Sequence, residues 1–424
     1  MKEIHQIFPL IVIYLTGYFL RIVHGSWLAP GPFFALFWSI FATLPLVFAP
    51  EFSFPPLGLW ILTAFVVAIG LGSILANVNL VTPRFLINKT HYSSKKMENI
   101  LFSATIIFSL LAFIGVVQLL YFGINRYEIK LTIYNILLIA SNLSVDRYND
   151  VITYPWSVKG PLYFLFPAAL AGGIMFGGPA KLKIKLISFL PIIISIIKGI
   201  IDTTRFTFLL TIVLWLSGYI GSRVLAHIHL NRIFDRKTLI LFISAGALFI
   251  VIFTGFQWLR QAGGELFADL MLERMKIYFF GYLSAFTNWA TQYSSNQITF
   301  GSFTFAGPAN LMGLLQRESG FYGFITIKDM QYINIFTVFR GIVTDFTLPG
   351  AFLITTFIGF WMSIAYVRLL TGNLLFLAPL TLFYAFTMYS PIISIFLYNS
   401  IIMAWVIIFS IIFILVPNEF KLNE

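Results

Sequence analysis

The sequence predicts an all-α polytopic membrane protein, and three observations lead to this fold class. The chain has 424 residues, of which 59% are hydrophobic and only 10% are charged, whereas soluble domains carry about 25% charged residues. Uncharged runs recur that match the roughly 20 residues a helix needs to cross a bilayer. Loops rich in Lys and Arg alternate with loops that are longer or less basic. With no soluble domain or internal repeat visible, we predict a single transmembrane domain over residues 1–424.

The uncharged runs predict about eleven transmembrane helices, within a range of ten to twelve. The first run follows one Lys and has no small-residue cleavage site after it, which indicates a retained helix and not a signal peptide. In the fifth run, the GxxxG pattern from Gly173 to Gly177 indicates close helix packing. The eleven runs cover residues 7–23, 31–49, 57–77, 100–122, 160–177, 185–201, 206–222, 238–258, 348–368, 373–392 and 394–416.

The distribution of Lys and Arg predicts the orientation of these helices. Three basic loops, at residues 78–99, 178–184 and 223–237, are separated from one another by even numbers of predicted spans and therefore lie on the same side of the membrane. Because they are rich in Lys and Arg, this side is predicted to be cytoplasmic. The net charge of +11 is this topological excess, so we expect no nucleic acid partner. The alternate loops face outward, and they include the two longest, at residues 123–159 and 259–347.

Both long outer loops are predicted to be folded, because they are rich in aromatic and aliphatic residues. Residues 128–142 are apolar on one side and too short to span, which favours a helix lying in the membrane interface. In residues 264–294, three acids recur at spacings of four, which places them on one helical face: Glu265, Asp269 and Glu273.

Arginine is the most informative residue on the predicted outer side. Its planar guanidinium binds phosphate oxygens in a bidentate manner and stays charged near lipid. Arg205 enters the seventh span directly from a short loop, at the depth of a lipid-linked diphosphate; snorkelling, or a pair with Asp202, is the alternative. The outer arginines are Arg126, Arg147, Arg205, Arg260, Arg274, Arg317 and Arg340.

A carboxylate is the predicted base on this side, because neither long outer loop contains His. Asp345, five residues after Arg340, and Glu273 are the candidates, with ion pairing or helix-end stabilisation as the alternative. The outer loop 50–56 has Glu51 but no second acid, and no His cluster or phosphate-binding Gly loop occurs. The absence of Cys also excludes a thiolate nucleophile and a Cys-ligated metal. We therefore expect chemistry without a metal or another cofactor.

The whole pattern resembles the Wzy-type O-antigen or oligosaccharide repeat-unit polymerases, which are membrane glycosyltransferases of the GT-C type. The resemblance rests on the span number, on Arg147 in SVDRYNDV and on Arg205 in DTTRFTFLL. It also rests on a late outer loop that ends in NIFTVFRGIVTDFTLPGAFL. The chain departs from the acid–aromatic–Gly triplet often found in that family, because Thr347 follows Asp345 and Phe346.

This resemblance implies a GT-C-like fold and polymerisation of undecaprenyl-diphosphate-linked repeat units at the periplasmic face of the bacterial inner membrane. The growing glycan would pass from its lipid carrier to a sugar hydroxyl of the newly flipped unit. The resemblance also implies three partners: the lipid-linked glycans, membrane lipids and a chain-length-regulating copolymerase of the Wzz type. The leaving diphosphate would be stabilised by Arg205 with Arg260, Arg274 or Arg340, while Arg147 and Arg317 would bind the glycan or the acceptor diphosphate.

Two alternatives remain open. An O-antigen ligase has the same general design but passes the glycan to the lipid A core, and the outer His expected of it is not found in the long loops. A lipid-linked oligosaccharide flippase or another transporter would also need Arg. We expect a transporter to have short outer loops and functional charges at the middle of the membrane, whereas this sequence predicts the charges to lie in loops.

Overall fold

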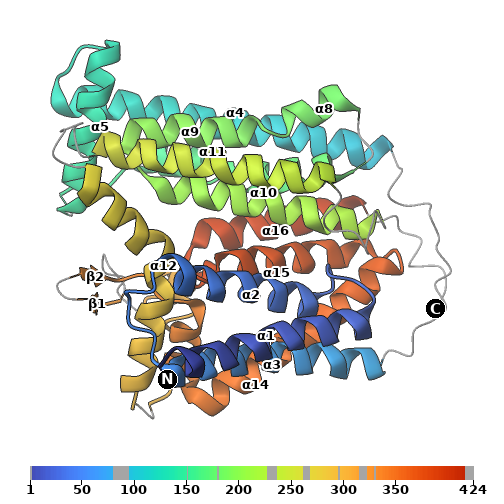
Figure 1. The fold of residues 1–424 in the computed structure, drawn as a ribbon. Helices are drawn as coiled ribbons and strands as arrows, with labels where there is room; N and C mark the ends of the chain where they lie inside the picture. The colour runs from blue at the N-terminus through green and yellow to red at the C-terminus, as the bar shows by residue number, and fades with distance from the viewer. Residues whose placement is uncertain are drawn as a thin grey trace. The chain divides into compact units, whose positions relative to one another are not determined.

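The computed structural model describes residues 2–79, 95–149, 151–178, 181–226, 236–260, 268–294, 297–314, 322–328 and 331–415. Helices dominate these residues (Figure 1). The chain divides into two compact units, which are described separately below. Unit 1 contains residues 1–88, 229–231 and 268–399, and unit 2 contains residues 89–228, 232–267 and 400–424.

Long apolar helices packed against one another form the core of unit 1. Phe65 on one helix stacks on Phe339 of another, with ring centroids 4.5 Å apart. Two glycines allow backbone contact in this core: a Cβ on Gly72 would lie 1.8 Å from the Thr356 carbonyl oxygen, and one on Gly359 would lie 2.1 Å from that of Ile69. The packed helices are α1 (Lys2–His24), α2 (Pro30–Phe48), α3 (Pro56–Asn79), α14 (Val338–Leu370) and α15 (Leu377–Tyr389).

A further helix of unit 1, α12 (Ala268–Gln292), runs across the bundle and contacts α2 and α3 (Figure 1). Hydrogen bonds fasten it there, because Ser284 Oγ and Asn288 Nδ2 donate to the Ser53 carbonyl oxygen at 2.6 and 2.9 Å. Strands β1 (Ile325–Lys328) and β2 (Gln331–Ile333) form an antiparallel pair that contacts the same helix. The remaining elements of unit 1 are α13 (Ala306–Leu311), η2 (Leu374–Phe376) and η3 (Ile395–Leu397).

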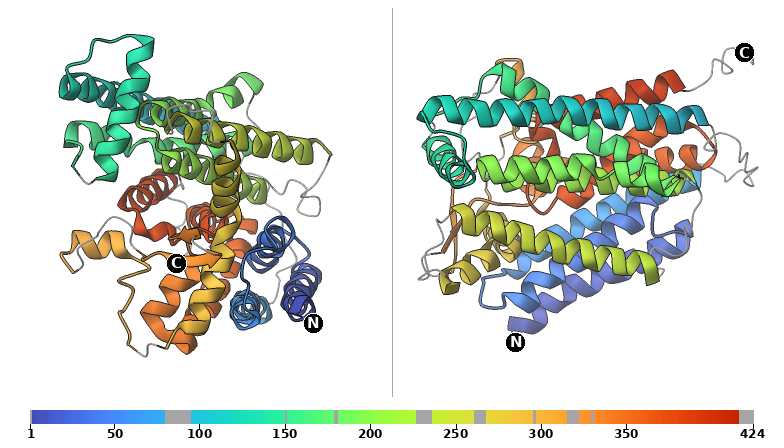
Figure 2. Two further views of the ribbon diagram at one scale, coloured as in Figure 1. Left: turned by 60° about the vertical axis from the view of Figure 1, so that its left-hand side comes forward. Right: turned by 90° about the horizontal axis from the view of Figure 1, so that it is seen from above.

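Unit 2 is built around α10 (Arg205–Leu225), which packs against α7 (Leu165–Gly177) and α9 (Leu190–Asp202). Both α7 and α9 also contact α4 (Lys95–Tyr127), and the long helices run side by side in Figures 1 and 2. At one end of this bundle lies α5 (Ile133–Tyr148), which contacts α4, α9 and α11 (Arg236–Arg260). The other helices are α6 (Trp156–Leu162), α8 (Leu182–Ile187) and α16 (Asn399–Leu415), of which α16 belongs to unit 2 from Ser400 onward.

Glycines bring α7 and α10 together. A Cβ on Gly173 would lie 2.0 Å from the Trp215 carbonyl oxygen, and one on Gly177 would lie 1.7 Å from Ser222 Oγ. The GxxxG pattern is therefore a helix-packing surface, and the prediction made from it is confirmed.

The chain is a multi-pass membrane protein. Among the described residues, eight helical segments are long and apolar enough to cross a bilayer, and they cover eight of the eleven predicted runs. The other three runs contain shorter apolar helices, at Gly246–Phe256, Leu374–Tyr389 and Asn399–Leu415.

The two long predicted loops contain helices in their described parts. Within residues 123–159, α5 is shifted toward the C-terminus relative to the expected helix over 128–142. Its exposed apolar side chains, such as Leu137 and Val145, fit a helix in the interface. The second loop, 259–347, is interrupted because α14 begins at Val338 and not near residue 348. A kink at Thr347 divides α14, so the part after it agrees with the predicted span over 348–368. Arg340 and Asp345 lie on the short helical part before the kink, where the sequence predicted a loop.

Candidate functional site

A tight turn joins α9 to α10 in unit 2 and holds a buried acid. Asp202 ends α9 with 1% of its surface exposed. The following residue, Thr203, has a left-handed backbone with φ +51°, which reverses the chain within two residues. The Asp202 carboxylate accepts hydrogen bonds from the Thr204 hydroxyl and from the Thr204 backbone N–H, the latter at 3.0 Å. The carboxylate thus closes the turn that begins α10.

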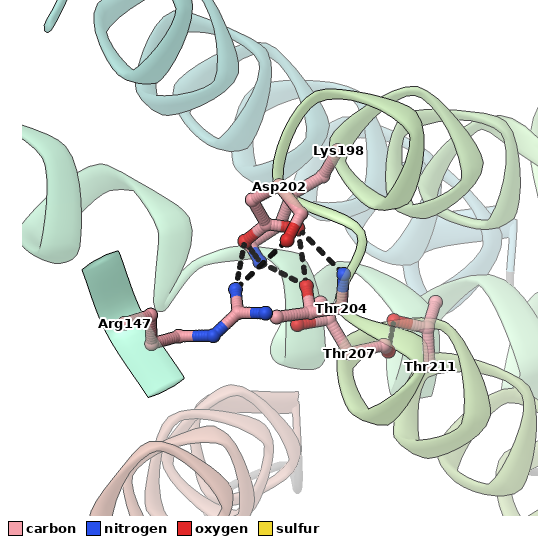
Figure 3. A network of polar contacts seen from close by, with 6 residues as sticks. All are labelled: Arg147, Lys198, Asp202, Thr204, Thr207 and Thr211. Carbon is pink, nitrogen blue, oxygen red and sulfur yellow. Dashed lines mark hydrogen bonds and ion pairs between the residues drawn. The ribbon is translucent and has the colours of Figure 1, made fainter. Parts of the chain in front are cut away.

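Two cations meet at this carboxylate, as Figure 3 shows. Lys198, one helical turn earlier on α9, places Nζ 2.6 Å from Asp202 Oδ2 and 2.9 Å from Thr204 Oγ1. Arg147, near the end of α5, donates from Nη1 to the Asp202 carbonyl oxygen at 2.8 Å and lies 3.8 Å from Oδ2. Residues from two separate helices therefore converge on one acid, and Lys198 is buried with it at 8% exposure.

Arg205 adds a third cation to this region. It is the first residue of α10, and its Cζ lies 4.7 Å from the Phe253 ring of α11. Lys198 and Arg147 carry one positive charge more than Asp202 neutralises, and the amino end of α10 adds a partial positive charge. We call this group the Asp202 site; it consists of Arg147, Lys198, Asp202, Thr204 and Arg205.

Tyr154 borders the Asp202 site in the segment that follows α5. Burial raises the pKa of its phenol to about 12; the negative charge of Asp202 acts in the same direction, and Arg147 opposes it. The hydroxyl therefore stays protonated at neutral pH, so Tyr154 can donate a hydrogen bond but cannot act as a base.

A different kind of cationic site lies in unit 1, around Arg340 in the first turn of α14. The guanidinium Cζ lies 3.7 Å from the ring centroid of Phe336, 4.3 Å from that of Tyr322 and 5.4 Å from that of Trp289. Its Nη1 atom is buried and has no hydrogen-bond partner in the described part of the chain. Cation–π attraction stabilises such a group. We call Arg340 and these three rings the Arg340 site.

Polar groups flank the Arg340 site. Burial raises the pKa of Tyr322, and the charges of Arg340 and Asp345 also act on that phenol, in opposite directions. A Cβ on Gly341 would lie 2.8 Å from the Tyr322 hydroxyl and 3.6 Å from Thr304 Oγ1. Thr304 Oγ1 is itself buried without a hydrogen-bond partner among the described residues.

Asp345 joins a loop to α14. Its carboxylate is 0% exposed and accepts hydrogen bonds from Thr299 Oγ1 at 2.7 Å, Phe303 N at 2.9 Å and Thr304 N at 2.6 Å. Both carboxylate oxygens are thus occupied by neutral donors of residues 299–304. This geometry supports a positioning role for Asp345, because a base must reach the proton that it removes.

The remaining sequence-predicted residues lie elsewhere. Glu273 and Arg274 are exposed on α12, and no described contact joins them to the Arg340 site. Arg260 ends α11, but its side chain lies outside the described part, as does the whole of Arg317. The structure thus brings Arg147 and Arg205 to one site in unit 2 and places Arg340 in another in unit 1.

Several residues of the two sites are missing from the sequence-based prediction. Lys198 and Asp202 carried a usable signal, because a spacing of four places them on one face of α9. Phe336 lies four residues before Arg340 and also carried a usable signal, whereas Trp289 and Tyr322 carried none because they lie before the β1–β2 hairpin.

No group of three or more His, Asp or Glu side chains that could hold a metal ion occurs among the described residues. No protein-family model matches this chain, and no curated protein or solved structure matches it.

Proposed function

We propose that this protein is a membrane glycosyltransferase that polymerises undecaprenyl-diphosphate-linked oligosaccharide repeat units at the periplasmic face of the bacterial inner membrane. The observation that carries the proposal is the Asp202 site, where Lys198 and Arg147 both approach one buried acid at the end of a membrane span and Arg205 begins the next helix. Lys198 and Arg147 carry one positive charge more than Asp202 neutralises, and this charge favours an anion at the depth of a lipid-linked diphosphate.

The chemistry asks the protein chiefly to stabilise developing negative charge. A sugar hydroxyl of the acceptor unit attacks the anomeric carbon of the growing glycan, and the bond from that carbon to the diphosphate oxygen breaks. The departing lipid diphosphate gains negative charge, which Arg147 and Arg205 stabilise; fixed cations in a partly buried site act more strongly than in water. The hydroxyl proton passes to a carboxylate or to an oxygen of the leaving diphosphate.

The reaction involves two lipid diphosphates, one on the donor and one on the acceptor. The Arg340 site, considered within unit 1 alone, is a second candidate for binding a phosphate. Its unpartnered Nη1 suits a phosphate oxygen, and its aromatic rings suit the apolar faces of sugars. Of the two predicted bases, the exposed Glu273 is the more accessible, and Asp345 is assigned the positioning of residues 299–304.

Transport of a lipid-linked oligosaccharide is the second candidate function, and one observation favours it. Lys198 and Asp202 are buried in the last turn of a span-length segment. Ionisable groups inside membrane spans are typical of transport pathways. These residues lie at the end of the segment and not at its middle, so they answer only part of the sequence-based argument against transport.

A reconstituted assay separates these functions. Purified protein is incubated with a synthetic lipid-diphosphate repeat unit, and the products are resolved by length. Polymerisation yields a ladder. Movement of the unchanged lipid across a vesicle membrane without a ladder would favour transport, and product on an added lipid A core would favour a ligase.

Arg205→Lys is the matched test of the site. It keeps the charge but removes the bidentate fork, so we expect ladder formation to fall at least tenfold while expression stays near normal. Arg126→Lys is the control, because Arg126 is exposed in the same unit and pairs with Asp146. If Arg205→Lys produced wild-type ladders, Arg205 would not belong to the site.

A further inference from the structure

A second pair of cations in unit 2 lies near the opposite end of α10 from the Asp202 site. Lys185 on α8 places Nζ 5.6 Å from the Phe176 ring centroid, and Arg223 on α10 places Cζ 5.8 Å from that of Tyr219. The two ring centroids are themselves 5.7 Å apart. The fold therefore places two cations, from two different helices, over adjoining aromatic rings.

The charges of this pair are not balanced by a described acid. Each of the two cations lies within electrostatic reach of the other, and no ion pair joins either of them to an acid among the described residues. Both side chains are only half-buried. Two like charges held together without an acid repel one another, and an anion placed between them removes that repulsion.

The position of the pair indicates the source of the anion. α10 has 21 residues, a length of about 31 Å, which is the thickness of the hydrocarbon core. If the Asp202 site is at one membrane surface, Lys185 and Arg223 are near the other. In the segment around α8, Lys181, Lys183 and Lys185 alternate with apolar residues, and Leu186 is 62% exposed. This composition fits the boundary between head groups and acyl chains.

We propose that Lys185 and Arg223 bind the phosphate of an anionic membrane phospholipid, on the side of the membrane that carries the Lys-rich loops. The rings of Phe176 and Tyr219 form the base of the site, and exposed apolar residues such as Leu186 contact the acyl chains. Basic sites between spans on the cytoplasmic side bind anionic head groups in this way. This inference does not depend on the proposed function.

The test uses the full chain, purified in a neutral detergent. The midpoint of thermal unfolding is followed as phosphatidylglycerol is added, with phosphatidylcholine as the neutral lipid and inorganic phosphate as the soluble anion. We expect saturable stabilisation by phosphatidylglycerol alone. Equal stabilisation by phosphatidylcholine would overturn the proposal, and so would an equal effect of inorganic phosphate, because the site would then bind free phosphate. This comparison needs only the wild-type protein.

Variants then locate the site. Lys185→Gln and Arg223→Gln should each raise the half-saturating phosphatidylglycerol concentration about fivefold, the equivalent of about 1 kcal/mol per cation. Lys183→Gln is the matched control, because it removes an exposed lysine from the same helix, and it should change that concentration less than twofold. Equal effects of Lys183→Gln and Lys185→Gln would mean that the lipid responds to general surface charge, and the assigned site would be wrong.

Discussion

Asp202 in unit 2 and Asp345 in unit 1 are both buried, but their partners differ in charge. Lys198 and Arg147 approach Asp202, together with the Thr204 hydroxyl and N–H. The Asp345 carboxylate meets only neutral donors, two backbone N–H groups and one hydroxyl. Each acid is followed closely by a threonine with positive φ, at Thr203 and Thr347. A similar local pattern therefore serves two electrostatic purposes.

This difference separates charge compensation from loop positioning. Asp202 lowers the cost of gathering cations at the end of a span, because a buried cation without an acid is strongly destabilising. Asp345 organises residues 299–304 through hydrogen bonds, while the nearby Arg340 relies on aromatic rings. Substituting residues of each site should therefore have different consequences for folding and for activity.

The largest effect is expected from Asp202→Ala. Removing this carboxylate leaves Lys198 buried without its acid, which should lower the free energy of unfolding by about 3–5 kcal/mol. The measurement is denaturant unfolding in mixed micelles. Asp146→Ala is the control, since its partner Arg126 is exposed, and it should behave like the wild type. Similar losses in both variants would contradict the charge-compensating role of Asp202.

Asp345→Asn should have a smaller effect. In the wild type, the Asp345 carboxylate accepts hydrogen bonds from three donors. The amide of Asn would place its own N–H donors against one or more of them, so we expect the free energy of unfolding to fall by about 1–3 kcal/mol. Polymerisation should fall only as far as the positions of residues 299–304 change. Glu273→Gln, on the exposed face of α12, should leave unfolding unchanged but abolish the ladder if Glu273 is the base. If Glu273→Gln kept the ladder and Asp345→Asn abolished it, Asp345 would be the base.

Arg340→Met sharpens the contrast between the two cationic sites. No acid pairs with Arg340 among the described residues, so an apolar side chain of similar length should preserve or increase stability. Activity should fall about 100-fold if the guanidinium stabilises a diphosphate. Unfolding and ladder formation are measured on the same preparation, with the exposed Arg274→Met as the control. A stable, fully active Arg340→Met protein would exclude the Arg340 site from the reaction.

The smallest effect concerns the two threonines. Thr347 interrupts α14 with φ +59° and ψ +175°, a conformation that is nearly restricted to glycine. Thr347→Gly should raise the free energy of unfolding by about 1 kcal/mol. Thr203→Gly should give a smaller gain, because φ +51° and ψ +24° lie in the ordinary left-handed region. A larger gain at Thr203 would show that the turn at Asp202 is the more strained one.

Much of the architecture was accessible from the sequence because membrane insertion imposes strong local requirements. The apolar runs, the GxxxG packing surface and the place of Arg205 at the start of a span could each be derived from neighbouring residues. The short helical part of α14 before the kink at Thr347 could not be derived in this way. It carries Arg340 and Asp345, and several of their partners are distant in the sequence, such as Trp289 and the backbone of Phe303 and Thr304.

The sequence alone determined that this chain is a multi-pass helical membrane protein, because each span must be apolar over its own length whatever surrounds it. Only the tertiary structure decided which cations share an acid, which lie among aromatic rings and which carboxylate is enclosed. Those relations join Arg147 to Asp202 and Trp289 to Arg340 across long stretches of chain. Their energies depend on burial and on distances between atoms, which no local pattern of residues specifies.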